Sequence, residues 1–113
     1  MIHGDGLQTR DYTYVEDIAY AIPKLYEFKA TRGKVINLAS GREVIIKELI
    51  HKIMEIMGYN GPVIHAPSRP GDVRRHLGDI SLAQNLINYK PKTDFQEGLE
   101  KTINWYKQNY AVD

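Results

Sequence analysis

Two short, turn-rich segments of the chain each place an arginine beside a carboxylate. In residues 4–17 Arg10 precedes Asp11, and in residues 68–75 Arg69 and Asp72 stand on either side of a Pro-Gly pair. A guanidinium group binds phosphate oxygens through two parallel hydrogen bonds, and a neighbouring carboxylate fixes its orientation. The two segments are therefore typical of two halves of one diphosphate-binding site. An isolated Arg-Asp pair, in contrast, is more often a surface ion pair of little energetic value.

The local sequence also predicts how these side chains are directed. Residues 1–14 favour short extended pieces, and alternation along such a piece puts Arg10 and Tyr12 on one face and Asp11 on the other. Pro70-Gly71 is a turn dipeptide, which lets the flanking arginine and aspartate converge. Two further arginines are expected to be solvated: Arg74 and Arg75.

Other patterns predict neither a cofactor site nor a metal site in this chain. Gly4-Asp5-Gly6 lacks the third glycine, the preceding apolar strand and the following helix of a dinucleotide-binding turn. The four histidines, at positions 3, 51, 65 and 76, show no metal-ligand spacing. We read all four as structural or solvated.

Composition and charge argue against a nucleic-acid-binding, a membrane or a disulfide-rich protein. The chain has 113 residues, a net charge of +1 with acidic and basic residues interspersed, and no cysteine. A chain of this length forms one domain at most, and the balanced charge indicates neither nucleic-acid binding nor a membrane surface. The absence of cysteine excludes a disulfide framework. With no signal peptide and no apolar run of about 20 residues, the expected location is the cytoplasm.

The elements that must hold these residues follow from periodicity and capping. An apolar stripe predicts a helix over 15–28, which Pro23 should kink or stop. Residues 34–38 indicate a buried strand. A second helix is expected over 46–57, ended by Gly58 and weakened because Ile45 stands where a capping Ser or Thr is usual.

The last third of the chain predicts a short strand and two helices. The strand is expected over 62–65, and Asp79 should cap a small helix that ends near Asn88. Asp94 and Glu97 form a plausible capping pair for the final helix. That helix is expected to bury Phe95, Leu99, Ile103, Tyr106 and Tyr110, with Trp105 on its flank. The fold class is therefore α+β, a small mixed helix/strand layer.

Seven blocks, two of them within the arginine segments, occur in a fixed order along the chain: 4–12, 15–19, 36–41, 69–75, 78–83, 89–93 and 97–106. In these blocks the chain resembles the C-terminal substrate-binding part of the NAD-dependent nucleoside-diphosphate-sugar epimerases and dehydratases. These are extended short-chain dehydrogenase/reductases, and UDP-glucose 4-epimerase is the nearest type. The resemblance covers nearly the whole chain.

The resemblance implies a division of labour. Residues 1–113 would be a nucleotide-sugar-binding domain, and the Rossmann domain that holds NAD and the catalytic tyrosine would be absent from this chain. The matching residues of relatives contact the diphosphate at Arg10 and Arg69, lie near the ligand at Tyr12, and contact the ribose or order the loop at Asp72. UDP-sugar is the expected ligand, and the parent enzyme is expected to be a homodimer.

The same resemblance implies that no catalytic residue lies in this chain. Tyr20 and Lys24 match the spacing of the superfamily's catalytic pair, but they align with a downstream helix, and Pro23 should distort the turn between them. Two alternatives stay open for the chain itself, a stand-alone non-catalytic binding or interaction module and an inactive truncated remnant. For the parent, a 4,6-dehydratase is the alternative chemistry.

Overall fold

The computed structural model describes residues 1–110, which form a small α+β structure as predicted. The elements, in chain order, are β1 (Ile2–His3), β2 (Thr9–Arg10), α1 (Val15–Glu27), the 3-10 helix η1 (Lys29–Thr31), β3 (Val44–Ile45), α2 (Ile46–Met57), β4 (His65–Ala66), α3 (Ser81–Ile87) and α4 (Phe95–Asn109). Strand β1 pairs in parallel with β4, and β2 pairs antiparallel with β3.

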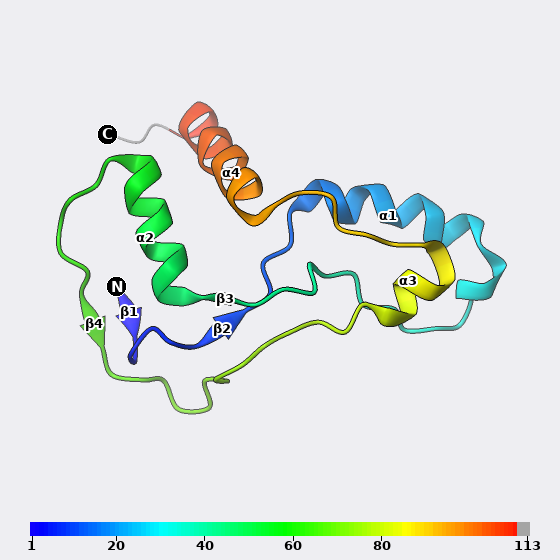
Figure 1. Cartoon of the computed structure of the whole chain (residues 1–113), viewed down its shortest axis with the longest axis horizontal. Helices are drawn as coiled ribbons and strands as arrows, with labels where there is room; N and C mark the ends of the chain where they lie inside the picture. Colours follow the sequence, from blue (N-terminus) through cyan, green and yellow to red (C-terminus); the bar gives the residue numbers. More distant parts are fainter. Residues whose placement is uncertain (111–113) are drawn as a thin grey trace.

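The elements gather in two lobes joined by extended connections (Figure 1). One lobe holds α2, α4 and the four short strands, and the other holds α1, η1 and α3. The radius of gyration is 16.8 Å, compared with about 13 Å for a compact domain of this length. The shape is therefore open, and much of the apolar surface lies outside any core.

The clearest core lies in the lobe of α1 and α3. Ala21, Ala83, Ile87 and Tyr89 are buried against one another, and partly buried aliphatic side chains surround them. This packing explains why α1 does not end at Pro23, which is exposed. The proline removes one backbone hydrogen bond, but Ala21 and Leu25 keep the helix packed against the core on both sides of it.

Helix α2 has the predicted bounds and begins without a side-chain cap at Ile45, as predicted. The backbone supplies the missing acceptors instead: Ile46 N–H donates to the Gln8 carbonyl at 3.0 Å and Lys47 N–H to the Gly6 carbonyl at 2.9 Å. These bonds satisfy amides that a capping side chain would otherwise bind. Gly58 ends the helix in the left-handed region, with φ of 65°.

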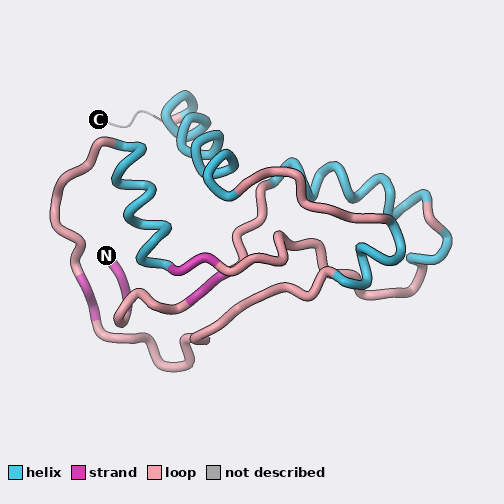
Figure 2. The backbone as a smooth tube through the Cα atoms, in the orientation of Figure 1, coloured by secondary structure: helices cyan, strands magenta, loops and turns pink. Residues whose placement is uncertain are grey.

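Two strand predictions need correction. Residues 34–38 form no strand, and Val35 is 93% exposed, because no other strand of the described residues lies beside this segment (Figure 2). The strand predicted at 62–65 forms only at His65–Ala66, where β1 provides a partner. Strand β3, which the sequence did not predict, exists because β2 pairs with it.

The bounds of α3 and α4 agree with the predictions better than the predicted buried residues do. Asn88 closes α3 in the left-handed conformation, and the Asp94 carboxylate accepts a hydrogen bond from Gln96 N–H at the start of α4. Glu97 does not complete a capping box, because it pairs with Lys101 at 2.7 Å. The predicted burial of Tyr106 and Tyr110 is wrong: they are 53% and 57% exposed. They pack instead on Trp105 and on each other.

Candidate functional site

The structure joins the two predicted halves of the site through Arg10. This residue ends β2, and its Nη2 donates to Asp72 Oδ1 at 2.6 Å. Its Nη1 donates to the carbonyl oxygens of Thr9 and Val73, both at 2.7 Å. The two side chains of the ion pair are only 26% and 29% exposed, so solvent screens them incompletely. Segments that lie far apart in the sequence thus meet at one guanidinium group.

The Pro-Gly turn forms as predicted, but its flanking side chains do not converge. Asp72 N–H donates to the Arg69 carbonyl at 3.1 Å, and Gly71 has a φ of 78°, which favours glycine. Arg69 Nη2 lies 2.9 Å from His3 Nε2, whereas Asp72 binds Arg10. Arg69 therefore contacts a residue of β1, and Asp72 contacts a residue of β2.

Asp11, the residue that follows β2, binds backbone amides of two loops through its carboxylate, a role that the sequence did not reveal. Its Oδ1 accepts Ser40 N–H at 2.8 Å, and its Oδ2 accepts Gly41 N–H at 3.0 Å and Gly78 N–H at 3.2 Å. Burial acts to raise the pKa of Asp11, but the hydrogen bonds from these three residues outweigh it and hold the pKa below its usual range. Asp11 therefore ties two loops to the residue that follows β2.

Tyr12 lies against α4, with its ring centroid 6.1 Å from that of Phe95. Burial raises the pKa of Tyr12, and the positive charge of Arg10 acts in the opposite direction. Tyr12 also lines a cavity of about 730 Å³ between α2 and α4, the α2–α4 groove, whose apolar lining includes Leu49, Ile53 and Leu99.

The remaining arginines of the second segment pair with acidic side chains other than Asp72. Arg74 donates to both carboxylate oxygens of Asp5, at 2.7 and 2.9 Å, and lowers the pKa of Asp5. Arg75 donates to Glu43 at 2.7 Å. Both arginines are largely exposed, as predicted, although each has an ionic partner. Such exposed pairs contribute little to stability.

The chain itself does not offer a dinucleotide site at its glycine pair. Gly4 and Gly6 both have positive φ values, and they form a turn between β1 and β2 that leads into no helix. A dinucleotide-binding turn instead presents a helix N-terminus to the diphosphate. Within residues 1–110 no group of three or more metal-binding side chains is found, and no helix of this part is long and apolar enough to cross a membrane.

The predicted distortion around Pro23 does not occur. Lys24 Nζ lies 4.4 Å from the centroid of the Tyr20 ring, because α1 continues through the proline and keeps the two residues one turn apart. A second lysine, Lys92, lies nearer still, at 3.9 Å. Tyr20 and Lys24 lie on α1, whereas Arg10 ends β2, which belongs to the other lobe (Figure 1).

Comparison with known proteins identifies the class to which this fold belongs, the NAD-dependent sugar-nucleotide epimerases and dehydratases. The family described as GDP-mannose 4,6 dehydratase matches residues 1–102, and the chain belongs to this family. The resemblance inferred from the sequence is thus confirmed.

Individual relatives carry several related activities. The chain is 35% identical to UDP-glucuronate 4-epimerase of Thermodesulfobacterium geofontis, covering 98% of this chain and 34% of the relative. It is 30% identical to dTDP-glucose 4,6-dehydratase of Streptomyces antibioticus, covering 97% and 33%. The chain thus spans about a third of the length of these relatives.

Solved structures confirm the fold. An epimerase of Methanothermobacter thermautotrophicus superposes with a TM-score of 0.92 at 37% identity, covering 96% of this chain and 33% of that one. The UDP-glucose 4-epimerase of Thermotoga maritima, solved with UDP-glucose, gives a TM-score of 0.87 at 33% identity, covering 95% and 34%. Other similar structures contain NAD, among them a UDP-glucuronic acid 4-epimerase of Bacillus cereus.

Proposed function

We propose that this chain is the nucleoside-diphosphate-sugar-binding part of an NAD-dependent sugar-nucleotide epimerase, most similar in role to UDP-glucose 4-epimerase. The observation that carries the proposal is the contact of 2.6 Å between Arg10 and Asp72, which joins the two segments that the sequence predicts to bind phosphate. The Thermotoga maritima relative, whose structure holds UDP-glucose, supports a UDP-sugar as the ligand. In this proposal Arg10 and Arg69 bind the diphosphate, Tyr12 lies beside the ligand, and Asp72 orders the loop or contacts the ribose.

Arg10 keeps N–H donors for a diphosphate after its hydrogen bonds within the protein are formed. A guanidinium group has five N–H donors, and three of them are used within the described residues, by Thr9, Val73 and Asp72. Two remain for phosphate oxygens, and the three internal bonds hold the group in place before the ligand arrives. Preorganisation of this kind reduces the entropy lost on binding. Arg69, at the exposed turn, supplies the second cation.

The proposal assigns residues 1–113 to a single binding domain that packs against a Rossmann domain carrying NAD. Helix α1 exposes an apolar stripe made of Val15, Ile22 and Tyr26, the last of them 88% exposed. The apolar side of the α2–α4 groove is open as well. A soluble monomer rarely leaves so much apolar surface uncovered. The chain would bind substrate and perform no chemistry alone, in a parent that is a homodimer of the cytoplasm.

The reaction of the parent has a second candidate. The family's description and the Streptomyces antibioticus relative both name a 4,6-dehydratase. Both reactions use the same kind of ligand, so the two candidates differ in the catalytic half and share the binding residues proposed for this chain. Assay of the parent with UDP-glucose and dTDP-glucose separates a 4-epimerised product from a 4-keto-6-deoxy product.

Calorimetric titration of the parent protein with UDP-glucose tests the binding role. Arg10→Ala and Arg69→Ala should each weaken binding by about 10- to 150-fold, because each removes charge-assisted hydrogen bonds worth about 1.5–3 kcal/mol. Arg74→Ala is the matched control, since this arginine lies in the same loop but is exposed and paired with Asp5. Its expected effect is below about 0.5 kcal/mol. If Arg74→Ala weakens UDP-glucose binding as much as Arg69→Ala does, the binding role in this loop belongs to Arg74. If none of the three variants weakens binding, the binding role is refuted.

A further inference from the structure

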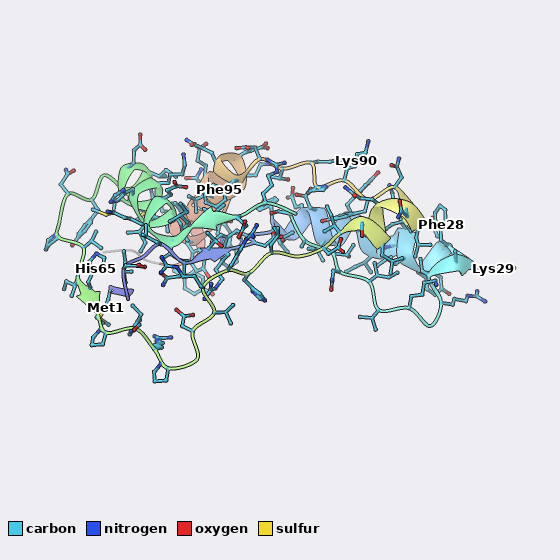
Figure 3. The ribbon with its side chains drawn as sticks, turned by 60° about the horizontal axis from the view of Figure 1, so that its bottom comes forward. Met1, Phe28, Lys29, His65, Lys90 and Phe95 are labelled. Carbon is cyan, nitrogen blue, oxygen red and sulfur yellow. The ribbon has the colours of Figure 1, made fainter. Side chains whose placement is uncertain are left out.

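A second cationic pocket lies in the lobe of α1 and α3, remote from the arginines. It has a volume of about 210 Å³ and is lined by Tyr20, Lys24, Asn88, Lys90 and Lys92, among others. Figure 3 shows Lys90 on the connection that passes over α1 on its way from α3 to α4. We call this feature the lysine pocket. It combines residues of one helix with residues of a loop more than sixty positions later.

The loop that carries two of these lysines is held firmly against α1. The buried Asp17 carboxylate accepts Lys92 N–H at 2.9 Å and Thr93 N–H at 3.2 Å. On the other side, Tyr89 is buried and its hydroxyl donates to the Ala39 carbonyl at 3.0 Å. Asn88 adopts the left-handed conformation that starts the loop. The backbone that carries Lys90 and Lys92 is therefore fixed by the fold.

The lysines of the pocket form no ion pair with a carboxylate among the described residues. Within the part of the chain that the structure describes, none of Lys24, Lys90 and Lys92 lies within 4.0 Å of a carboxylate oxygen, whereas Arg10, Arg42, Arg74, Arg75 and Lys101 all do. Lys24 and Lys92 lie at 4.4 and 3.9 Å from the centroid of one ring, that of Tyr20. Cations gathered at one ring repel each other, and a bound anion would relieve this repulsion.

The positive charge of the lysine pocket also affects the ionisation of Tyr20. Its hydrogen bond with Lys24, reinforced by the charges of Lys24 and Lys92, lowers the pKa of the Tyr20 phenol. A negative charge is thus favoured at the point where the lysines meet. The phenol O–H is in addition a hydrogen-bond donor that an oxyanion could use.

We propose that the lysine pocket binds a phosphate group, either inorganic phosphate or the terminal phosphate of a small phosphate ester. The ammonium groups of Lys24 and Lys92, which meet at the Tyr20 ring, together match the charge of one doubly charged oxyanion, whereas a carboxylate would neutralise only one of them. Lysine binds phosphate as a point charge with three donors. The site lies in the other lobe from Arg10 and is independent of the sugar-nucleotide role proposed above.

Titration of the protein with inorganic phosphate, followed by NMR of lysine Nζ and tyrosine Cζ, tests the proposal. Saturable shifts at Lys24, Lys90, Lys92 and Tyr20 are expected, together with a rise in the pKa of Tyr20, because bound phosphate offsets the lysine charges. The Lys24→Gln/Lys92→Gln double variant should weaken binding at least tenfold. Lys29→Gln/Lys107→Gln changes the net charge equally, lies outside the pocket, and should keep the wild-type affinity.

Further titrations distinguish the free phosphate ion from a phosphate ester, and the lysine pocket from the arginine site. A titration with glycerol 3-phosphate that gives tighter binding than inorganic phosphate identifies an ester as the ligand, and the reverse order identifies the free ion. Binding should persist in Arg10→Ala/Arg69→Ala, which disables the other site. Equal weakening by the pocket variant and the control variant, or equal binding of chloride, would show general charge attraction and overturn the proposal. So would a Tyr20 pKa that stays constant at saturating phosphate.

Discussion

Replacement of Asp11 by asparagine keeps the shape of the side chain and removes its charge. The asparagine oxygen can still accept Ser40 N–H, but its amino group would face the N–H groups of Gly41 and Gly78, which the native Oδ2 binds at 3.0 and 3.2 Å. Two amides then lose their acceptor. A hydrogen bond to a charged group contributes about 1.5–3 kcal/mol, and partial exposure of Asp11 reduces this. We expect Asp11→Asn to lower the free energy of unfolding by about 2–3 kcal/mol.

Urea denaturation measures this loss, and Trp105, the single tryptophan, supplies the fluorescence signal. With a slope of about 1–3 kcal/mol/M, the midpoint should fall by about 0.7 to 3 M. Asp79→Asn is the control, because Asp79 is exposed and accepts one amide, from Ser81. Its loss should be about 1 kcal/mol or less. A midpoint for Asp11→Asn that equals that of the wild type would refute the role given to the three amide bonds.

The effect of Asp11 should depend on pH with a defined sign. Because its pKa is lowered in the folded state, the folded protein binds this proton less readily than the unfolded chain does. The stabilisation is present above the unfolded value of about 3.9 and is lost as the pH falls through the lower folded-state pKa. The difference in unfolding free energy between wild type and Asp11→Asn should therefore shrink in acid. A difference that stays constant down to the acid limit of folding would contradict this assignment.

Three further predictions follow from the site and the exposed surfaces. The chain alone should neither bind NAD nor epimerise UDP-glucose, and micromolar NAD binding by calorimetry would exclude the assignment of NAD to another domain. Arg10→Lys in the parent should recover only part of the affinity that Arg10→Ala loses, because lysine lacks the planar fork; full recovery would argue for a simple charge effect. The chain alone should self-associate or bind an apolar dye through the stripe of Val15, Ile22 and Tyr26, and Tyr26→Glu should reduce this. A stable monomer without dye binding would favour an independent module.

Local patterns predicted the helices well, because the forces that define them act over a few residues. The bounds of α2 followed from its apolar stripe and from Gly58, and the end of α3 followed from Asn88. The turn at Pro70-Gly71 was predicted for the same reason: proline presets one backbone angle and glycine tolerates the other. The family was also evident from the ordered sequence blocks, and the α+β class followed from the order of the predicted helices and strands.

Predictions that depend on a partner were less successful. Residues 34–38 have the composition of a strand, but strand formation requires a neighbour, and none lies beside them in the described residues. Pro23 should have ended α1 on local grounds, yet packing of Ala21 and Leu25 outweighs the lost hydrogen bond. Tyr106 and Tyr110 match a helical stripe, but no other element of the described structure covers that face enough to bury them.

The sequence by itself indicated the family and most of the helices, and it gave the prediction of which residues bind a diphosphate. These depend on residue type and short-range order. Only the tertiary structure decided that Arg10 meets Asp72, that Asp11 binds three amides from two distant loops, and that Lys92 joins Lys24 at the Tyr20 ring. Each of these contacts joins segments whose separation along the chain says nothing about their distance in space, since it is the packing of the helices and the pairing of the strands that brings them together.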